Sequence, residues 1–172
     1  MKKFLKSSLL LAPIFLLSCS NQDAKKTSKK VEKKIEKSIE KMETAEKEVV
    51  EITLIAKGET MSEIAFEPKT LSIPANSIVK LTLENKSGTA GMFHNFVLVP
   101  MGAGQEIATA GISAGKENDF VPNDKRVLAH TKMTNIGETT QIEFEAPSKG
   151  SYHYICSFPG HYPGMVGKLV VE

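Results

Sequence analysis

Alternating apolar and polar residues mark the C-terminal two-thirds of the chain. From Val49 onward, short stretches of this kind are separated by Pro, Gly and Asn residues, a pattern typical of half-buried β-strands joined by turns. The stretches lie at residues 51–55, 70–73, 78–83, 93–99, 140–144, 151–156 and 167–171. Seven short strands in about 120 residues predict an all-β fold, a Greek-key β-sandwich or barrel.

Residues 100–134 interrupt this pattern. They are rich in Gly, Ala and charged residues and show little alternation. We therefore expect an excursion outside the sheets, a partly helical flap with a short helix around residues 105–110.

The N-terminus has the layout of a secretory signal. Three lysines precede an apolar run over residues 9–17, which is too short to span a bilayer, for which about 20 residues are needed. The run ends in Leu-Leu-Ser-Cys19 and resembles a bacterial lipobox, in which the cysteine is lipidated and becomes the mature N-terminus. This predicts a lipoprotein signal peptide over residues 1–18 and lipidation of Cys19. The alternative is a plain secretory signal with an incidental cysteine.

Residues 19–48 have the composition of a tether. They consist mainly of Lys and Glu and contain no Gly, Pro or aromatic residue. A thin apolar stripe at residues 31, 35, 39 and 42 favours a semi-rigid, partly helical spacer over a short coiled coil with a partner chain. The folded domain is therefore expected at residues 49–172.

Net charge divides along the same boundaries. The total of +2 over 172 residues is the sum of +3 in residues 1–18, +2 in residues 19–48 and −3 in residues 49–172. A domain that neutralises nucleic-acid phosphates needs a clustered positive face. The acidic balance of the expected domain therefore argues against nucleic acid as a partner.

One segment near the C-terminus concentrates candidate metal ligands. Cys156, His161 and Met165 follow the spacing Cys-x4-His-x3-Met. Thiolate, imidazole and thioether suit copper, and two His with one Cys and a distant Met form an electron-transfer blue copper site. His94, in the expected strand 93–99, is the candidate second histidine. Taken singly, Cys156 could be a buried structural thiol and Met165 an ordinary core residue.

Three blocks in the same order resemble the cupredoxin family, most closely azurin, with auracyanin close by. They are His-Asn-Phe-Val-Leu from His94, the Gly-Ile-Ser-Ala-Gly-Lys segment with residues 127–132, and Cys-Ser-Phe-Pro-Gly-His from Cys156 through residue 169. The resemblance covers residues 60–172. It implies one type 1 copper, bound strongly by His94, Cys156 and His161 and weakly by Met165.

The resemblance also implies roles for the residues around these ligands. Asn95 and Ser157 would tie the two ligand segments together, and the Phe158 backbone N–H would donate to the cysteine sulfur. Phe93 precedes His94 where azurin has a glycine whose carbonyl is a distant fifth contact, so plastocyanin's four-ligand form is the alternative. His161 would reach the surface through an apolar patch and serve as the electron port.

These features together predict a membrane-anchored blue copper protein that carries single electrons between redox proteins, such as cytochromes or copper oxidoreductases, in the bacterial cell envelope. Ser20 after the lipidated cysteine favours the outer membrane. The alternative is a copper carrier or chaperone that delivers the metal to another protein. A copper enzyme would need several more histidines, and only His130 and His153 remain, so no enzymatic activity is expected.

Overall fold

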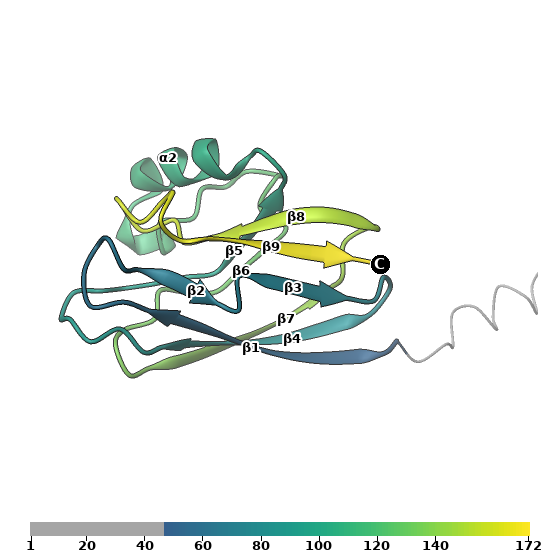
Figure 1. The fold of residues 1–172 in the computed structure, drawn as a ribbon. Coiled ribbons are helices and arrows are strands. Elements are labelled where there is room, and N and C mark those ends of the chain that lie inside the picture. Colours follow the sequence, from purple (N-terminus) through teal and green to yellow (C-terminus); the bar gives the residue numbers. More distant parts are fainter. Residues whose placement is uncertain (1–46) are drawn as a thin grey trace, which may run out of the picture. The chain divides into compact units, whose positions relative to one another are not determined.

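A computed structural model describes residues 47–172 of the chain. In it two β-sheets pack face to face, and one helix lies on the outer side of the second sheet (Figure 1). The predicted all-β sandwich with a helical flap is confirmed. The predicted signal peptide, Cys19 and nearly all of the predicted tether lie outside the described residues.

The first sheet contains four strands in the order β2-β1-β4-β7. Their bounds are Val49–Lys57 for β1, Ala65–Glu67 for β2, Ile78–Asn85 for β4 and Thr139–Glu145 for β7. The central strands β1 and β4 run parallel, whereas β2 and β7 join them antiparallel.

The second sheet contains five strands in the order β3-β9-β8-β5-β6. Their bounds are Thr70–Ile73 for β3, Val97–Pro100 for β5, Ala129–His130 for β6, Gly150–Ile155 for β8 and Val166–Val171 for β9. Only β3 and β9 pair in parallel; the other pairs are antiparallel.

The main core lies between the sheets, as strand alternation requires. In β4, Val79, Leu81 and Leu83 face inward and are at most 1% exposed, whereas the lysine between the first two is exposed. Tyr154 of β8 and Phe96, which directly precedes β5, pack against them, and the two aromatic ring centroids are 5.8 Å apart. Inward positions from distant parts of the chain thus form one apolar layer.

A second, smaller core lies under the flap. Helix α2 (Gly104–Ala114), followed by the 3-10 turn η1 (Lys116–Asn118), places Ile107 and Ala108 against Val97, Val99 and Ile155. Those three residues belong to the face of β5 and β8 that points away from the other sheet. Because β5 is covered on both faces, its first three residues are all buried instead of alternating.

Two elements differ from the sequence prediction by more than two residues at one end, and the short strands β2 and β6 were not predicted. The strand expected at residues 93–99 begins only at Val97, and His94 forms an isolated bridge with Thr134. The helix extends beyond residues 105–110 because its burial on β5 and β8 supports further turns, and it ends at Gly115, whose φ is +76°. Among residues 47–172 we find no helix of the length and apolarity needed to cross a membrane.

Candidate metal centre

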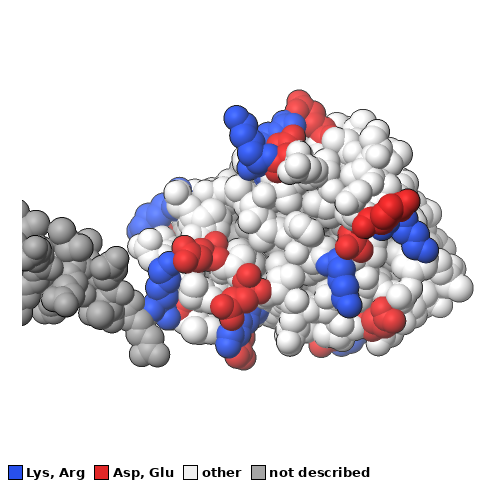
Figure 2. All heavy atoms as spheres, turned by 180° about the vertical axis from the view of Figure 1, so that it is seen from behind, with Lys and Arg blue, Asp and Glu red and all other residues white. Residues whose placement is uncertain are grey.

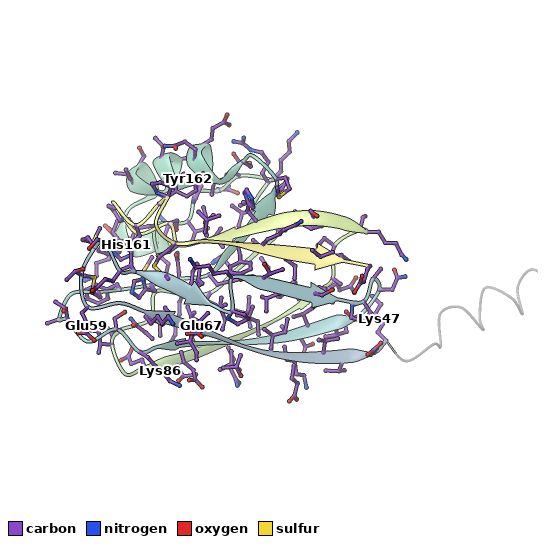
Figure 3. The ribbon with its side chains drawn as sticks, in the orientation of Figure 1. Lys47, Glu59, Glu67, Lys86, His161 and Tyr162 are labelled. Atoms are coloured by element: carbon purple, nitrogen blue, oxygen red, sulfur yellow. The ribbon has the colours of Figure 1, made fainter. Side chains whose placement is uncertain are left out.

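Three side chains meet at one end of the sandwich. His94 precedes β5, Cys156 follows β8, and His161 lies in the loop from β8 to β9. Their ligand atoms all lie within 4.8 Å of one another. The Nδ1 atoms of His94 and His161 are 3.8 Å and 3.5 Å from the Cys156 sulfur. Figure 3 shows His161 at the end of the sandwich opposite to Lys47.

Met165 lies beside this cluster and closes the loop that contains His161. The Met165 side chain is fully buried in the main core together with Cys156. The Met165 N–H donates to the His161 carbonyl at 2.9 Å, and the Cys156 N–H donates to the Met165 carbonyl at 3.1 Å. The loop is therefore held at both ends by its own backbone.

Asn95 joins the segments that contain the histidine and the cysteine. The Asn95 Nδ2 donates to Ser157 Oγ at 2.9 Å, and the Ser157 N–H donates to Asn95 Oδ1 at 2.9 Å. The same amide also donates to the Asp119 carbonyl, at 2.9 Å. Both side chains are fully buried, so this pair of hydrogen bonds is shielded from water.

His161 is buried, not exposed as expected from the resemblance. It is 1% exposed, and the ring of Phe158 lies against it with centroids 4.7 Å apart. Phe158 is itself half-buried and stacks on Phe93, with centroids 5.9 Å apart. The expectation that His161 reaches the surface is therefore wrong, because aromatic side chains cover this end of the sandwich. The place of Phe93 beside the metal ligands, with the four-ligand form as the alternative to a contact through its carbonyl, stays a prediction.

Burial sets the protonation states of the three clustered groups. It lowers the pKa of His94 to about 3, with the neighbouring His161 contributing, and it lowers the pKa of His161 to about 4. Burial also raises the pKa of the Cys156 thiol to about 11, although backbone N–H groups of Asn95 and Phe158 donate to the sulfur and oppose the rise. Both imidazoles are therefore neutral at pH 7, with lone pairs free for a metal.

The chemistry of these donors fits copper. A thiol, two neutral imidazoles and an adjacent buried thioether form the His2Cys-plus-Met set of blue copper sites. No carboxylate belongs to the cluster found within residues 47–172, and His130 and His153 are not members either. Oxygen ligands suited to calcium or magnesium are thus missing from this group.

A comparison with protein families decides the classification. The model of copper binding proteins of the plastocyanin/azurin family matches residues 50–172. The chain belongs to the plastocyanin/azurin family. Copper is therefore its cofactor, as the sequence predicted.

Individual relatives cover the same region. Auracyanin-A of Chloroflexus aurantiacus is 42% identical over 126 residues, which are 72% of this chain and 75% of that protein. Azurin iso-2 of Methylomonas sp. is 37% identical over 127 residues, 70% of this chain and 96% of that protein. The solved structure of auracyanin A matches with a TM-score of 0.65 at 38% identity, covering 72% of this chain and 99% of that one.

Sequence reasoning missed two polar side chains near His94 in this cupredoxin. Ser87 and Asn85 are 3% and 1% exposed, and Ser87 Oγ lies 2.9 Å from His94 Nε2. Both residues stand in an ordinary polar turn of the sequence, Asn-Lys-Ser-Gly. Only their position seven to nine residues before a candidate ligand could have suggested a role.

Proposed function

We propose that this protein is a type 1 copper electron carrier. His94, Cys156 and His161 are the strong ligands, and Met165 is the weak axial ligand. The supporting observation is the convergence of three buried ligand atoms within 4.8 Å, next to a buried methionine. A structure of the relative auracyanin A is described as that of a "blue" copper protein, and the donors that meet here are those of blue copper sites in general.

Rigidity of the ligand segments supports electron transfer over copper delivery. The His161 loop is closed by two backbone hydrogen bonds, and Asn95 links the His94 and Cys156 segments. A site that moves little between Cu(I) and Cu(II) transfers electrons faster, whereas a carrier needs exposed, exchangeable ligands. Burial of all three clustered side chains opposes rapid exchange of the metal.

Electrons would enter and leave through the aromatic side chains that cover the copper end of the sandwich. Phe158 contacts His161 and lines an open groove next to it. The groove is formed by Phe93, Lys116, Asp119, Phe120, Met133, Asn135 and Phe158. A mainly apolar surface of this kind suits brief docking of redox proteins such as cytochromes or copper oxidoreductases, since carriers must dissociate quickly.

We further propose that lipidated Cys19 anchors the chain in the bacterial cell envelope, with the outer membrane favoured. The supporting observations are the short apolar run before Cys19 and the Lys/Glu-rich segment after it.

The surface charge of the domain is mixed in sign. No continuous basic patch is visible on the face in Figure 2, where Lys and Arg lie among Asp and Glu side chains.

Addition of Cu(II) to the purified metal-free chain tests the ligand assignment. We expect an intense blue thiolate charge-transfer band, narrow copper hyperfine splitting, and loss of both in Cys156→Ser. A colourless wild type, or an unchanged band in that variant, would refute the assignment. Rapid loss of copper to a chelator together with slow electron self-exchange would instead indicate a carrier.

A further inference from the structure

Ser87 contacts the candidate ligand His94 from the side that faces away from the cysteine. The Ser87 hydroxyl oxygen lies 2.9 Å from Nε2 of the ring, whereas Nδ1 lies 3.8 Å from the Cys156 sulfur. Both side chains are at most 3% exposed. The two nitrogens of this imidazole therefore have different partners, a hydroxyl on one side and the cluster on the other.

Asn85, the last residue of β4, holds Ser87 in this place. Its Oδ1 accepts a hydrogen bond from the Ser87 backbone N–H at 3.1 Å. Its Nδ2 donates to the carbonyls of Met92 at 2.7 Å and Thr134 at 2.9 Å. Thr134 in turn exchanges two backbone hydrogen bonds with His94. One buried amide thus fixes both the turn that contains Ser87 and the backbone beside His94.

We propose that Ser87 is a positioning residue for the copper site, an inference that rests on the proposed ligand role of His94. The Ser87 hydroxyl accepts a hydrogen bond from the Nε2–H of His94. This bond selects the tautomer whose Nδ1 lone pair is free for the metal, and it fixes the plane of the ring. Metal-bound histidines generally donate their second ring N–H to a nearby acceptor, and loss of that acceptor typically lowers metal affinity 10- to 100-fold.

The hydroxyl can be removed without removing the support of the turn. Asn85 binds the backbone N–H of Ser87, not its side chain, so Ser87→Ala keeps that hydrogen bond and loses only the contact with His94. Ser87→Thr retains a hydroxyl and serves as the rescue variant. Ser77 supplies the matched control: it is 1% exposed, its hydroxyl donates to the Pro74 carbonyl at 2.8 Å, and it precedes the opposite end of β4.

The first measurement is nitrogen-15 NMR of the His94 ring in the metal-free full chain. We expect a single Nε2–H tautomer in the wild type and in Ser77→Ala, and a mixture of tautomers in Ser87→Ala. A wild-type ring protonated at Nδ1 would overturn the proposal without any variant, as would an unchanged tautomer in Ser87→Ala.

The second measurement is a competition titration of copper against a chelator, with electron paramagnetic resonance of the Cu(II) form. We expect Ser87→Ala to bind about 10- to 100-fold more weakly with an altered hyperfine splitting, and Ser87→Thr to recover both. Ser77→Ala should match the wild type in both. If the wild type forms a blue site and Ser87→Ala has the same copper affinity and hyperfine splitting, the positioning role of Ser87 is refuted and the ligand assignment stands. Should the wild type form no blue site, the ligand assignment itself fails.

Discussion

At the scale of single residues, Asn95 links three parts of the chain that are distant in sequence. Its side chain exchanges two hydrogen bonds with Ser157, beside the cysteine, and donates a third to Asp119 in the flap. The residue is fully buried, so water cannot replace these partners. Asn95 therefore contributes to both stability and the geometry of the copper site.

Replacement of Asn95 by alanine is expected to destabilise the domain. The buried Ser157 N–H would lose its partner, at a cost of about 1–3 kcal/mol, and the half-buried Asp119 carbonyl would lose one hydrogen bond. Denaturant unfolding of the metal-free chain measures this loss as a decrease in the free energy of unfolding. Asn118→Ala is the control, because Asn118 is exposed and its side chain bonds only the Ala114 carbonyl. Equal losses of stability in the two variants would contradict the role of Asn95.

Residue types and spacing were sufficient to select Cys156, His161 and Met165, which lie within ten residues of one another, whereas His94 was selected from its place in an expected strand and from the resemblance. The supporting residues Ser87 and Asn85 were not predictable in this way. A hydrogen bond between side chains seven residues apart, such as that of Ser87 with His94, depends on how the turn folds back. Polar turn residues of this kind have no distinguishing pattern in the sequence.

At the scale of elements, helix α2 completes the burial of β5. Ile107 is fully buried against the outer face of the second sheet, whereas Ile112 on the same helix is 56% exposed. The helix has no side-chain N-cap and no basic residue in its last turn, so packing, more than capping, holds it in place.

The two isoleucines of α2 provide a direct test of this packing. Ile107→Ala should lower the free energy of unfolding by about 2–5 kcal/mol, because it removes apolar contacts and leaves a cavity. Ile112→Ala should change it by no more than about 0.5 kcal/mol. Thermal and denaturant unfolding measure both, and similar losses for the two would show that α2 does not depend on this contact.

An ionic cluster connects the same helix to the following loop. Arg126 donates to Asp124 through Nε at 3.1 Å and Nη2 at 2.8 Å, and it also pairs with Glu106 of α2. Hydrogen bonds from Arg126 lower the pKa of Asp124 from 3.8 to about 2. Because the folded-state pKa is depressed, the stabilisation is complete above pH 4 and disappears as the pH falls toward 2.

Arg126→Gln is therefore expected to raise the pKa of Asp124 from about 2 toward 3.8 and to remove this acid-dependent part of the stability. Carboxyl NMR titration measures the pKa. Lys125→Gln is the matched control, since Lys125 is the weakest of the groups that lower this pKa. An Asp124 pKa that is the same with Gln at position 126 would contradict the assignment.

At the scale of the whole molecule, the two cysteines are expected to have separate tasks. Cys156 is a free, fully buried thiol in the metal cluster, and Cys19 follows the apolar run of the predicted signal. Residues 19–48 would separate the anchor from the copper domain, which lets the domain meet partners away from the lipid surface.

Substitution of each cysteine should affect only one of these tasks. In a bacterial host, Cys19→Ser should abolish incorporation of radioactive palmitate and release the protein from the membrane fraction, while the blue band of the purified protein persists. Cys156→Ser should remain membrane-bound and colourless. Membrane retention and labelling of Cys19→Ser would contradict the lipid anchor.

The strand pattern, the fold class and the residue types of the copper site could be predicted from the amino-acid sequence alone, because alternation and ligand spacing are local properties of the chain. Three further features depend on tertiary packing. Packing of α2 buried the outer face of β5, the aromatic rings around Phe158 covered His161, and the folding of one polar turn placed Ser87 against His94. Each of these contacts joins residues whose surfaces meet only in the folded domain, and no local pattern in the sequence specifies which surfaces meet.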